Sequence, residues 1–130
     1  MAGATIRMTA RKQESLQTVY NKLRSIDGAE QIAKSTQTVN DVEIWTLVYE
    51  KYFLRTGSYT SVTVVLTEFG PIQTACVVAS GGGEGLANYS FGANRNLAKD
   101  SVKALESCGF QIVESDLGKQ DKGLLERIFE

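Results

Sequence analysis

Histidine is absent from this 130-residue chain, and cysteine and proline are scarce, with two copies and one copy. Without histidine the chain cannot form a Ser-His or Cys-His catalytic pair, a histidine metal site or a histidine pH switch. Cys76 and Cys108 lie far apart and form no Cys-x-x-Cys pair, so no zinc or redox motif is present. We therefore expect no metal, no cofactor and no recognisable catalytic residue, and we expect both cysteines to be free thiols that pack in the interior.

Charge of either sign is also limited, with 14 basic and 15 acidic residues and a formal net charge of -1. This balance argues against nucleic acid or an anionic membrane as the partner, because both attract strongly basic surfaces. No apolar run reaches the roughly 18 residues that a membrane-spanning helix needs. The first residues, 1–7, do not form a signal peptide. We expect a cytoplasmic protein with no membrane attachment.

Apolar residues recur with a period of two in some segments and at helical spacing in others, which predicts a mixture of strands and helices. The segment Ala29–Val39 is polar and rich in Thr, Ser and Gln, and this composition suits an edge strand. The expected strands are Ala4–Ala10, Ala29–Val39, Val42–Arg55, Tyr59–Glu68 and Ile72–Ser80. The expected helices are Arg11–Ile26, which Asp27-Gly28 ends, and a second from Asn94 or Asn96 to about Ser107. A connector, Leu86–Ala93, precedes the second helix, and a short extended piece, Phe110–Val113, follows it.

This order lacks the alternation of strands and helices that a parallel sheet requires, so the fold class is α+β. We expect a five-stranded antiparallel sheet with two helices on one face, in the order strand–helix–four strands–helix. Residues 1–114 form the single predicted domain. Residues 115–130 form a C-terminal tail with a short amphipathic helix around Leu124, Leu125, Ile128 and Phe129.

Two resemblances accompany these patterns. The segments Leu47–Arg55, Ala79–Gly85 and Tyr89–Gly92 combine an aromatic-rich strand, a meander and a glycine cluster, and they resemble a family of small uncharacterised bacterial proteins known as a domain of unknown function. This resemblance covers the middle half of the chain, from Val42 to Gly92, and implies no catalytic residue, because the family has no established activity. The order of elements resembles the TATA-binding-protein-like topology and its helix-grip relatives, without any pattern of DNA-reading residues.

The glycine cluster and one acidic residue are the candidates for a ligand site. Gly82 and Gly83 follow a predicted strand, and Arg95 lies near the start of the next helix, an arrangement that can bind an anion. The cluster lacks the Gly-Lys-Ser/Thr of the Walker pattern, and it fails Gly-x-Gly-x-x-Gly because Asn88 stands where the third glycine would be. A flexible crossover is therefore favoured over anion binding. Glu50 and Tyr52 share one parity of the strongest strand, and an ion pair or a position at the rim of the strand is favoured for Glu50 over acid–base chemistry.

Both faces of the strand Val42–Arg55 are apolar, so both require covering. One parity carries the aromatic residues Trp45, Tyr49 and Phe53, which we expect to form either the core or an interface. Two helices cover only one face of a sheet. The other face therefore meets a second subunit, the tail or an apolar ligand, and a homodimer is the leading hypothesis.

Two functions from different classes fit these observations. The first is a small non-enzymatic binding or assembly domain that self-associates through a sheet face. The alternative is a protein that binds a small apolar or anionic ligand, or an enzyme that uses Glu50, a tyrosine and the glycine loop on a small phosphorylated substrate. The absence of histidine, of clustered cysteines and of complete phosphate motifs favours the first.

Overall fold

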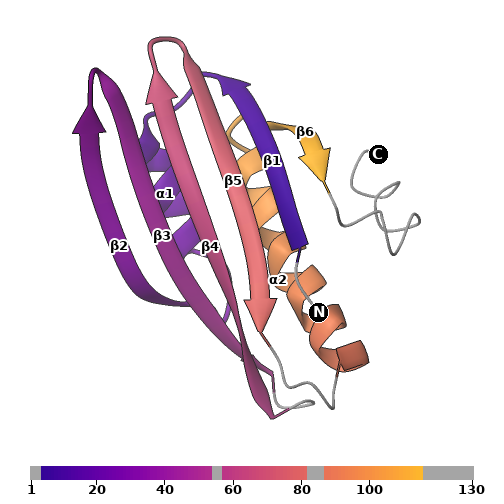
Figure 1. Ribbon diagram of the computed structural model, residues 1–130. Helices are drawn as coiled ribbons and strands as arrows, with labels where there is room; N and C mark the ends of the chain where they lie inside the picture. Colours follow the sequence, from indigo (N-terminus) through magenta and orange to yellow (C-terminus); the bar gives the residue numbers. More distant parts are fainter. Residues whose placement is uncertain (1–3, 54–56, 82–86, 116–130) are drawn as a thin grey trace.

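The computed structural model describes residues 4–53, 57–81 and 87–115, and everything below concerns these residues. They form one antiparallel sheet and two helices (Figure 1). The elements are β1 (Ala4–Arg11), α1 (Leu16–Arg24), β2 (Glu30–Val39), β3 (Val42–Phe53), β4 (Ser58–Phe69), β5 (Ile72–Gly81), α2 (Ala87–Glu106) and β6 (Gln111–Ser115).

The sheet has six strands in the order β2-β3-β4-β5-β1-β6, so the α+β class is confirmed and the predicted number of five strands is wrong. The additional strand is β6, which contains most of the extended piece expected at Phe110–Val113. It pairs with the free edge of β1, where Met8 lies opposite Ile112, and so satisfies backbone groups that would otherwise be unpaired. Ser115, the last residue of β6, is also the last described residue, and the domain boundary expected after residue 114 stays a prediction. The predicted helix of the tail lies outside the described residues.

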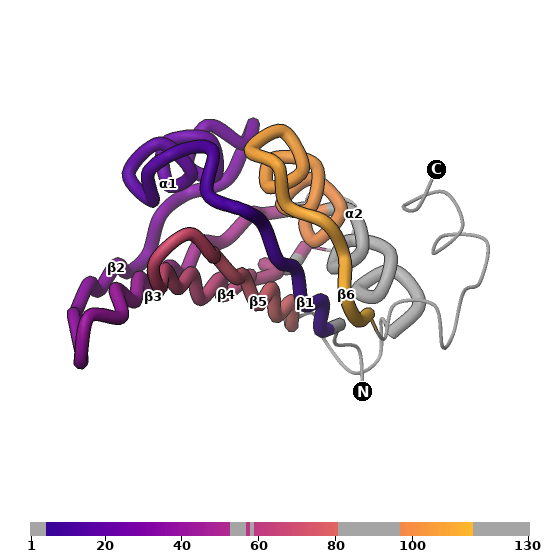
Figure 2. Tube along the Cα trace, turned by 90° about the horizontal axis from the view of Figure 1, so that it is seen from above, coloured from indigo at the N-terminus to yellow at the C-terminus, as the bar shows by residue number. Residues whose placement is uncertain are grey.

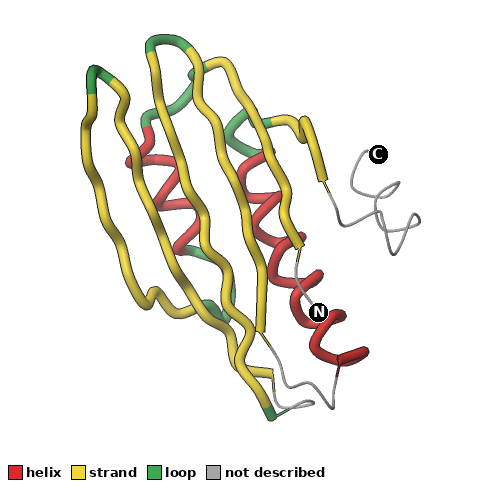
Figure 3. The backbone as a smooth tube through the Cα atoms, viewed as in Figure 1, coloured by secondary structure: helices red, strands yellow, loops and turns green. Residues whose placement is uncertain are grey.

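Both helices pack on the same face of the sheet, as expected (Figure 2). Figure 3 shows the two helices in red. Their boundaries differ from the predictions. The first helix begins at Leu16 rather than Arg11, because the Ser15 Oγ accepts a hydrogen bond from the Thr18 backbone N–H and caps it. The second helix begins at Ala87, so the expected connector Leu86–Ala93 is mostly helical.

Tight turns set the register of the central meander, β2 to β5. Asn40 and Asp41 both have positive φ, 49° and 68°, which is the backbone of a two-residue hairpin with the right twist for β2 and β3. Gly70, with φ 58°, connects β4 to β5. These turns place Val39 opposite Val42 and Phe69 opposite Ile72. Between β3 and β4, Trp45 lies opposite Leu66, Leu47 opposite Val64, and Tyr49 opposite Val62.

The core lies between the sheet and the two helices. Its sheet side consists of the alternate residues that the register brings together, including Val62, Val64 and Leu66, all without solvent exposure. The inward residues of α2 recur at helical spacing, and Cys108 is buried as predicted. The buried helix residues are Leu16, Val19, Tyr20 and Leu23 of α1 and Leu97, Ala98, Ser101, Val102 and Leu105 of α2.

Candidate functional site

The sheet face opposite the helices is a candidate binding surface, because no described element covers it (Figure 2). We call its β3–β5 part the open face. Its residues alternate along each strand with the buried residues of the core. They are Val42, Ile44, Thr46, Val48, Glu50 and Tyr52 of β3, Tyr59, Ser61, Thr63, Val65, Thr67 and Phe69 of β4, and Ile72, Thr74, Cys76, Val78 and Ser80 of β5.

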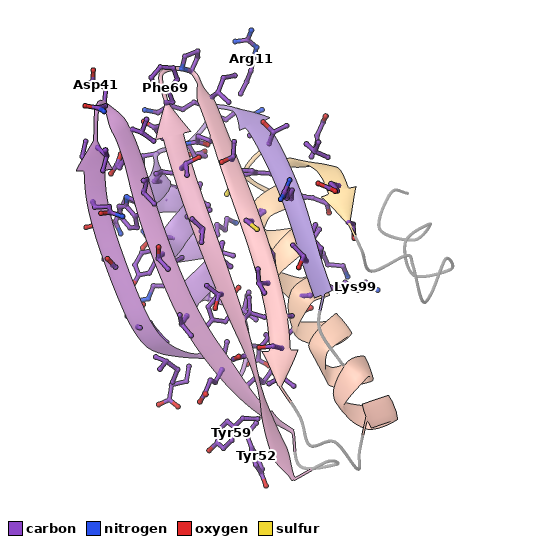
Figure 4. The ribbon with its side chains drawn as sticks, in the orientation of Figure 1. Arg11, Asp41, Tyr52, Tyr59, Phe69 and Lys99 are labelled. Atoms are coloured by element: carbon purple, nitrogen blue, oxygen red, sulfur yellow. The ribbon has the colours of Figure 1, made fainter. Side chains whose placement is uncertain are left out.

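Glu50 is the one charged residue of the open face. The centre is rich in threonine and valine, and large apolar or aromatic side chains lie at both ends (Figure 4). Phe69 is 62% exposed at one end, and Tyr52 and Tyr59 are 45% and 54% exposed at the other. Water therefore contacts a long, almost uncharged surface, which is the usual character of an interaction site.

The structure separates the residues predicted to bind a ligand. Glu50 and Tyr52 do share the open face, and the Tyr52 ring lies 4.9 Å from the Tyr59 ring, centroid to centroid. Arg95 belongs to α2, in the layer on the other side of the sheet, and its side chain is not described. Gly82 and Gly83 lie outside the described residues. No described geometry therefore joins the glycine loop to Glu50.

Of the three aromatic residues expected at the core or at an interface, two lie in the core beneath the helices. Trp45 is 7% exposed and Tyr49 is 5% exposed. The side chain of Phe53 is not described. The open face is therefore built from the other parity of β3, which begins with Val42 and ends with Tyr52.

Trp45 is held on three sides. Its indole Nε1 donates a hydrogen bond to Glu43 Oε2 at 2.8 Å, and its ring centroid lies 5.6 Å from that of Tyr20. The Lys34 ammonium lies over both rings, 4.4 Å from the Tyr20 centroid and 5.0 Å from the Trp45 centroid. A lysine of the edge strand β2 thus covers aromatic surface at the border of the core.

A second candidate is a pocket of about 260 Å3 between α1 and the β2–β3 hairpin, which the sequence patterns did not predict. The chain reverses just before it at Gly28, whose φ is +80°. Its lining residues are Tyr20, Leu23, Arg24, Ala29, Glu30, Gln31, Leu47 and Tyr49. Tyr20 and Leu23 lie at helical spacing on the apolar face of α1, but no sequence signal showed that β2 leaves space beneath them.

The polar groups of this pocket are arranged around Tyr20. The Tyr20 hydroxyl donates a hydrogen bond to Gln31 Oε1. The Arg24 guanidinium carbon lies 5.5 Å from the Tyr20 ring centroid. Deeper in the core, burial raises the pKa of Tyr49 above its usual range; the hydrogen bond with Ser101 opposes this rise, and the charge of Asp100 adds to it. Tyr49 is therefore a neutral group at physiological pH.

A further polar cluster closes the other end of the sheet. The buried Gln73 Nε2 donates to the Glu14 carbonyl at 2.7 Å and to Glu68 Oε1 at 2.9 Å, while Lys12 Nζ lies 2.9 Å from Glu68 Oε2. Burial alone would raise the pKa of Glu68, but the hydrogen bonds from Lys12 and Gln73 and the charge of Lys12 together lower it. We interpret this cluster as a structural clasp between β4, β5 and the segment before α1.

Comparison with known protein families gives a match over residues 1–109 to a family of unknown function, DUF6054. The chain belongs to the DUF6054 family. The match spans β1 to the end of α2 and is much longer than the middle half indicated by the sequence resemblance, while β6 lies beyond it. No curated protein matches the chain.

Two observations on the described part of this DUF6054 protein bear on its chemistry. No group of three or more cysteine, aspartate or glutamate side chains is placed to hold a metal ion there. Within the same residues, no helix combines the length and apolar character needed to cross a membrane.

Cys76 differs from the expectation for both thiols, since it is half-buried on the open face rather than packed in the core.

Proposed function

We propose that this DUF6054 protein is a non-enzymatic binding module that self-associates, with the open faces of two copies packed against each other. The observation that carries the proposal is that both helices cover one side of the sheet and leave the almost uncharged open face to solvent. Burying such a surface is favourable, because transfer of apolar area out of water releases about 25 cal/mol per Å2.

The size of the sheet supports a stable contact. At about 3.4 Å per residue and about 4.8 Å between strands, the open face, β3 to β5, spans roughly 550 Å2, and the neighbouring strands β1 and β2 widen the same side of the sheet to roughly 800 Å2. The part that β1 adds carries Arg7 and Arg11, which lie opposite Cys76 and Ile72. A standard specific interface covers about 800 Å2 on each partner. One sheet face is therefore as large as such an interface requires.

The chemistry of the open face also favours a second copy over a charged partner. Its centre carries Thr46, Thr63, Val48 and Val65, so two copies meet without burying a charge there. Glu50 lies toward one end, opposite Glu30 of β2 in the register. A polyanion such as nucleic acid would meet no positive charge on β3, β4 or β5 of this face.

The test is the molecular mass in solution, measured by sedimentation equilibrium from low micromolar to near-millimolar concentration. The wild-type chain should approach twice its 14.2 kDa mass as concentration rises. Thr63→Lys places an ammonium at the centre of the open face and should weaken association by roughly a hundredfold or more, because an unpaired charge is buried. Thr38→Lys is the matched control; Thr38 is exposed on β2 and lies opposite Glu43, on the helix side of the sheet.

The control should associate like the wild type. A wild-type monomer across the whole range, or association that Thr63→Lys leaves unchanged, would contradict the proposal. Cys76 provides an independent readout, because thiol labelling of this open-face residue should slow as the fraction of dimer rises with protein concentration. The buried Cys108 should react slowly at every concentration.

We further infer a cytoplasmic location and a TATA-binding-protein-like topology. The two free thiols support a reducing compartment, where cysteines stay unpaired. The element order from β1 to α2 supports the topology, although β6 adds a strand to it. Localisation of a tagged chain and comparison with an experimentally solved fold would test these two inferences.

A further inference from the structure

We propose that the pocket between α1 and the β2–β3 hairpin binds a small apolar carboxylic acid, with the ligand carboxylate on the Arg24 guanidinium. This site is separate from the open face, since the residues that α1 and β3 contribute to its walls belong to the helix side of the sheet. Binding there would not require self-association, so the two proposals can fail independently.

The size of the cavity selects the ligand class. An apolar cavity of about 150 Å3 accepts a benzene molecule. At about 260 Å3, this pocket has space for one such ring together with a short polar arm. A larger fused-ring or long-chain molecule would exceed it.

The walls provide an apolar environment for the ring. Leu23 of α1 and Leu47 of β3 are buried, and Ala29 is partly buried at the start of the hairpin. The Tyr20 and Tyr49 side chains complete the lining. The Tyr20 hydroxyl is already bonded to Gln31 and the Tyr49 hydroxyl to Ser101, so these two tyrosines contribute mainly their rings.

The positive charge at the pocket comes from Arg24, in the last turn of α1. Its guanidinium lies against the Tyr20 ring and has no ion-pair partner among residues 4–53, 57–81 and 87–115. Glu30 is the acidic residue of the lining, and it too has no ion-pair partner within those ranges. A guanidinium presents parallel N–H donors that match the two oxygens of a carboxylate.

Lys34 adds a second positive charge near Tyr20, although it does not line the pocket. Its ammonium lies over the Tyr20 ring, so cations of α1 and β2 both face that ring. Around Tyr20 and the pocket, the two positive charges of Arg24 and Lys34 outnumber the negative charge of Glu30. This balance favours an anionic head group over an amine.

The experiment is a titration of the full-length protein with 3-phenylpropanoate, followed by two-dimensional 1H–15N NMR. Saturable shifts are expected at the amides of Gln31 and Leu47, which line the pocket. Arg24→Gln should weaken binding by roughly 10- to 100-fold, the loss of a charge-assisted bidentate contact. Lys22→Gln removes an equal charge from the same helix turn, outside the pocket lining, and should weaken binding less than about twofold.

Two further comparisons keep the result interpretable if Arg24→Gln disturbs the fold. The uncharged analogue 3-phenylpropan-1-ol should bind the wild type more weakly than the acid by a similar factor. Ala29→Leu should fill the cavity and abolish binding of both compounds. Absence of saturable shifts, equal binding of acid and alcohol, binding that survives Ala29→Leu, or shifts confined to the open face would each overturn the proposal.

Discussion

A buried hydrogen bond joins β3 to α2, and removal of its two hydroxyl groups, one at a time, should lower the free energy of unfolding by different amounts. The Tyr49 hydroxyl lies 2.5 Å from Ser101 Oγ, and Ser101 Oγ also donates to the Leu97 carbonyl at 2.9 Å. Because serine has one hydroxyl proton and the Leu97 carbonyl accepts it, Tyr49 is the donor in the pair. Both side chains are almost fully buried.

The expected magnitudes follow from what each substitution leaves behind. Tyr49→Phe keeps the ring, and Ser101 keeps its bond to Leu97, so the free energy of unfolding should fall by about 1 kcal/mol. Ser101→Ala leaves the tyrosine hydroxyl buried without a partner, which costs about 2 kcal/mol, while better helix propensity returns about 0.5 kcal/mol. The double variant orphans neither group and should cost only about 1 kcal/mol.

The double-mutant cycle should therefore show a coupling of about 1.5 kcal/mol, with the double variant more stable than the sum of the two single effects predicts. Urea unfolding at neutral pH, followed by circular dichroism, measures the three free energies, and an unchanged slope confirms that only stability has altered. Ser107→Ala is the matched control, because Ser107 is exposed and its hydroxyl donates to the Ala104 carbonyl. Additive single effects would refute the assigned contact.

Alkaline pH gives the same pair a second readout. The pKa of Tyr49 is raised above its ordinary value of 10.0, so the folded state holds the phenol proton after the unfolded chain has lost it. The stability that Tyr49 contributes is complete below pH 10 and declines as pH rises further. Tyr49→Phe should reduce the alkaline slope of the unfolding free energy by up to about 1.4 kcal/mol per pH unit.

Two other perturbations test the core and the polar clasp. Trp45→Ala should lower the unfolding free energy by about 3 to 5 kcal/mol, as for other buried aromatic residues, and should not weaken self-association of the folded chain. Unchanged stability together with lost association would instead place Trp45 at the interface. The lowered pKa of Glu68 means that its contacts with Lys12 and Gln73 stabilise the fold above the ordinary pKa of 4.5 and are lost as pH falls through the lower, folded value. The stability difference between wild type and Glu68→Gln should therefore shrink in acid. Glu114→Gln, in an exposed ion pair, is the control and should change stability by less than about 0.5 kcal/mol at any pH. A Glu68→Gln effect that does not depend on pH would refute the stabilising role assigned to the contacts of Glu68.

Local patterns predicted most of the fold. The alternation along β3, β4 and β5 predicted three consecutive strands, because a period of two depends on neighbouring residues alone. The predicted first residue of each helix was wrong. Hydrophobic spacing does not reveal a cap made by a polar side chain such as Ser15, and the second helix begins at Ala87, before the asparagines that were expected to start it.

The sequence patterns left undecided which face of β3 the helices cover, although the neighbouring strand β4 indicated it. β4 alternates fully apolar residues, Val62, Val64 and Leu66, with Thr63, Val65 and Thr67. Combined with the register, that difference would have placed Trp45 and Tyr49 inside. Of the residues predicted to bind a ligand, Glu50 and Tyr52 are brought together by the described structure, on the open face.

The amino-acid sequence by itself determined the α+β class, the meander and the inward residues of α2, since these follow from the periods of strands and helices. Only the tertiary structure decided which face of β3 the helices cover, because both parities are apolar and the choice depends on cross-strand partners many residues away. The same holds for β6, which pairs with the free edge of β1 across roughly a hundred residues, and for the pocket at Arg24. Its walls come from one helix and two strands, and a space between elements depends on how those elements pack rather than on any one of them.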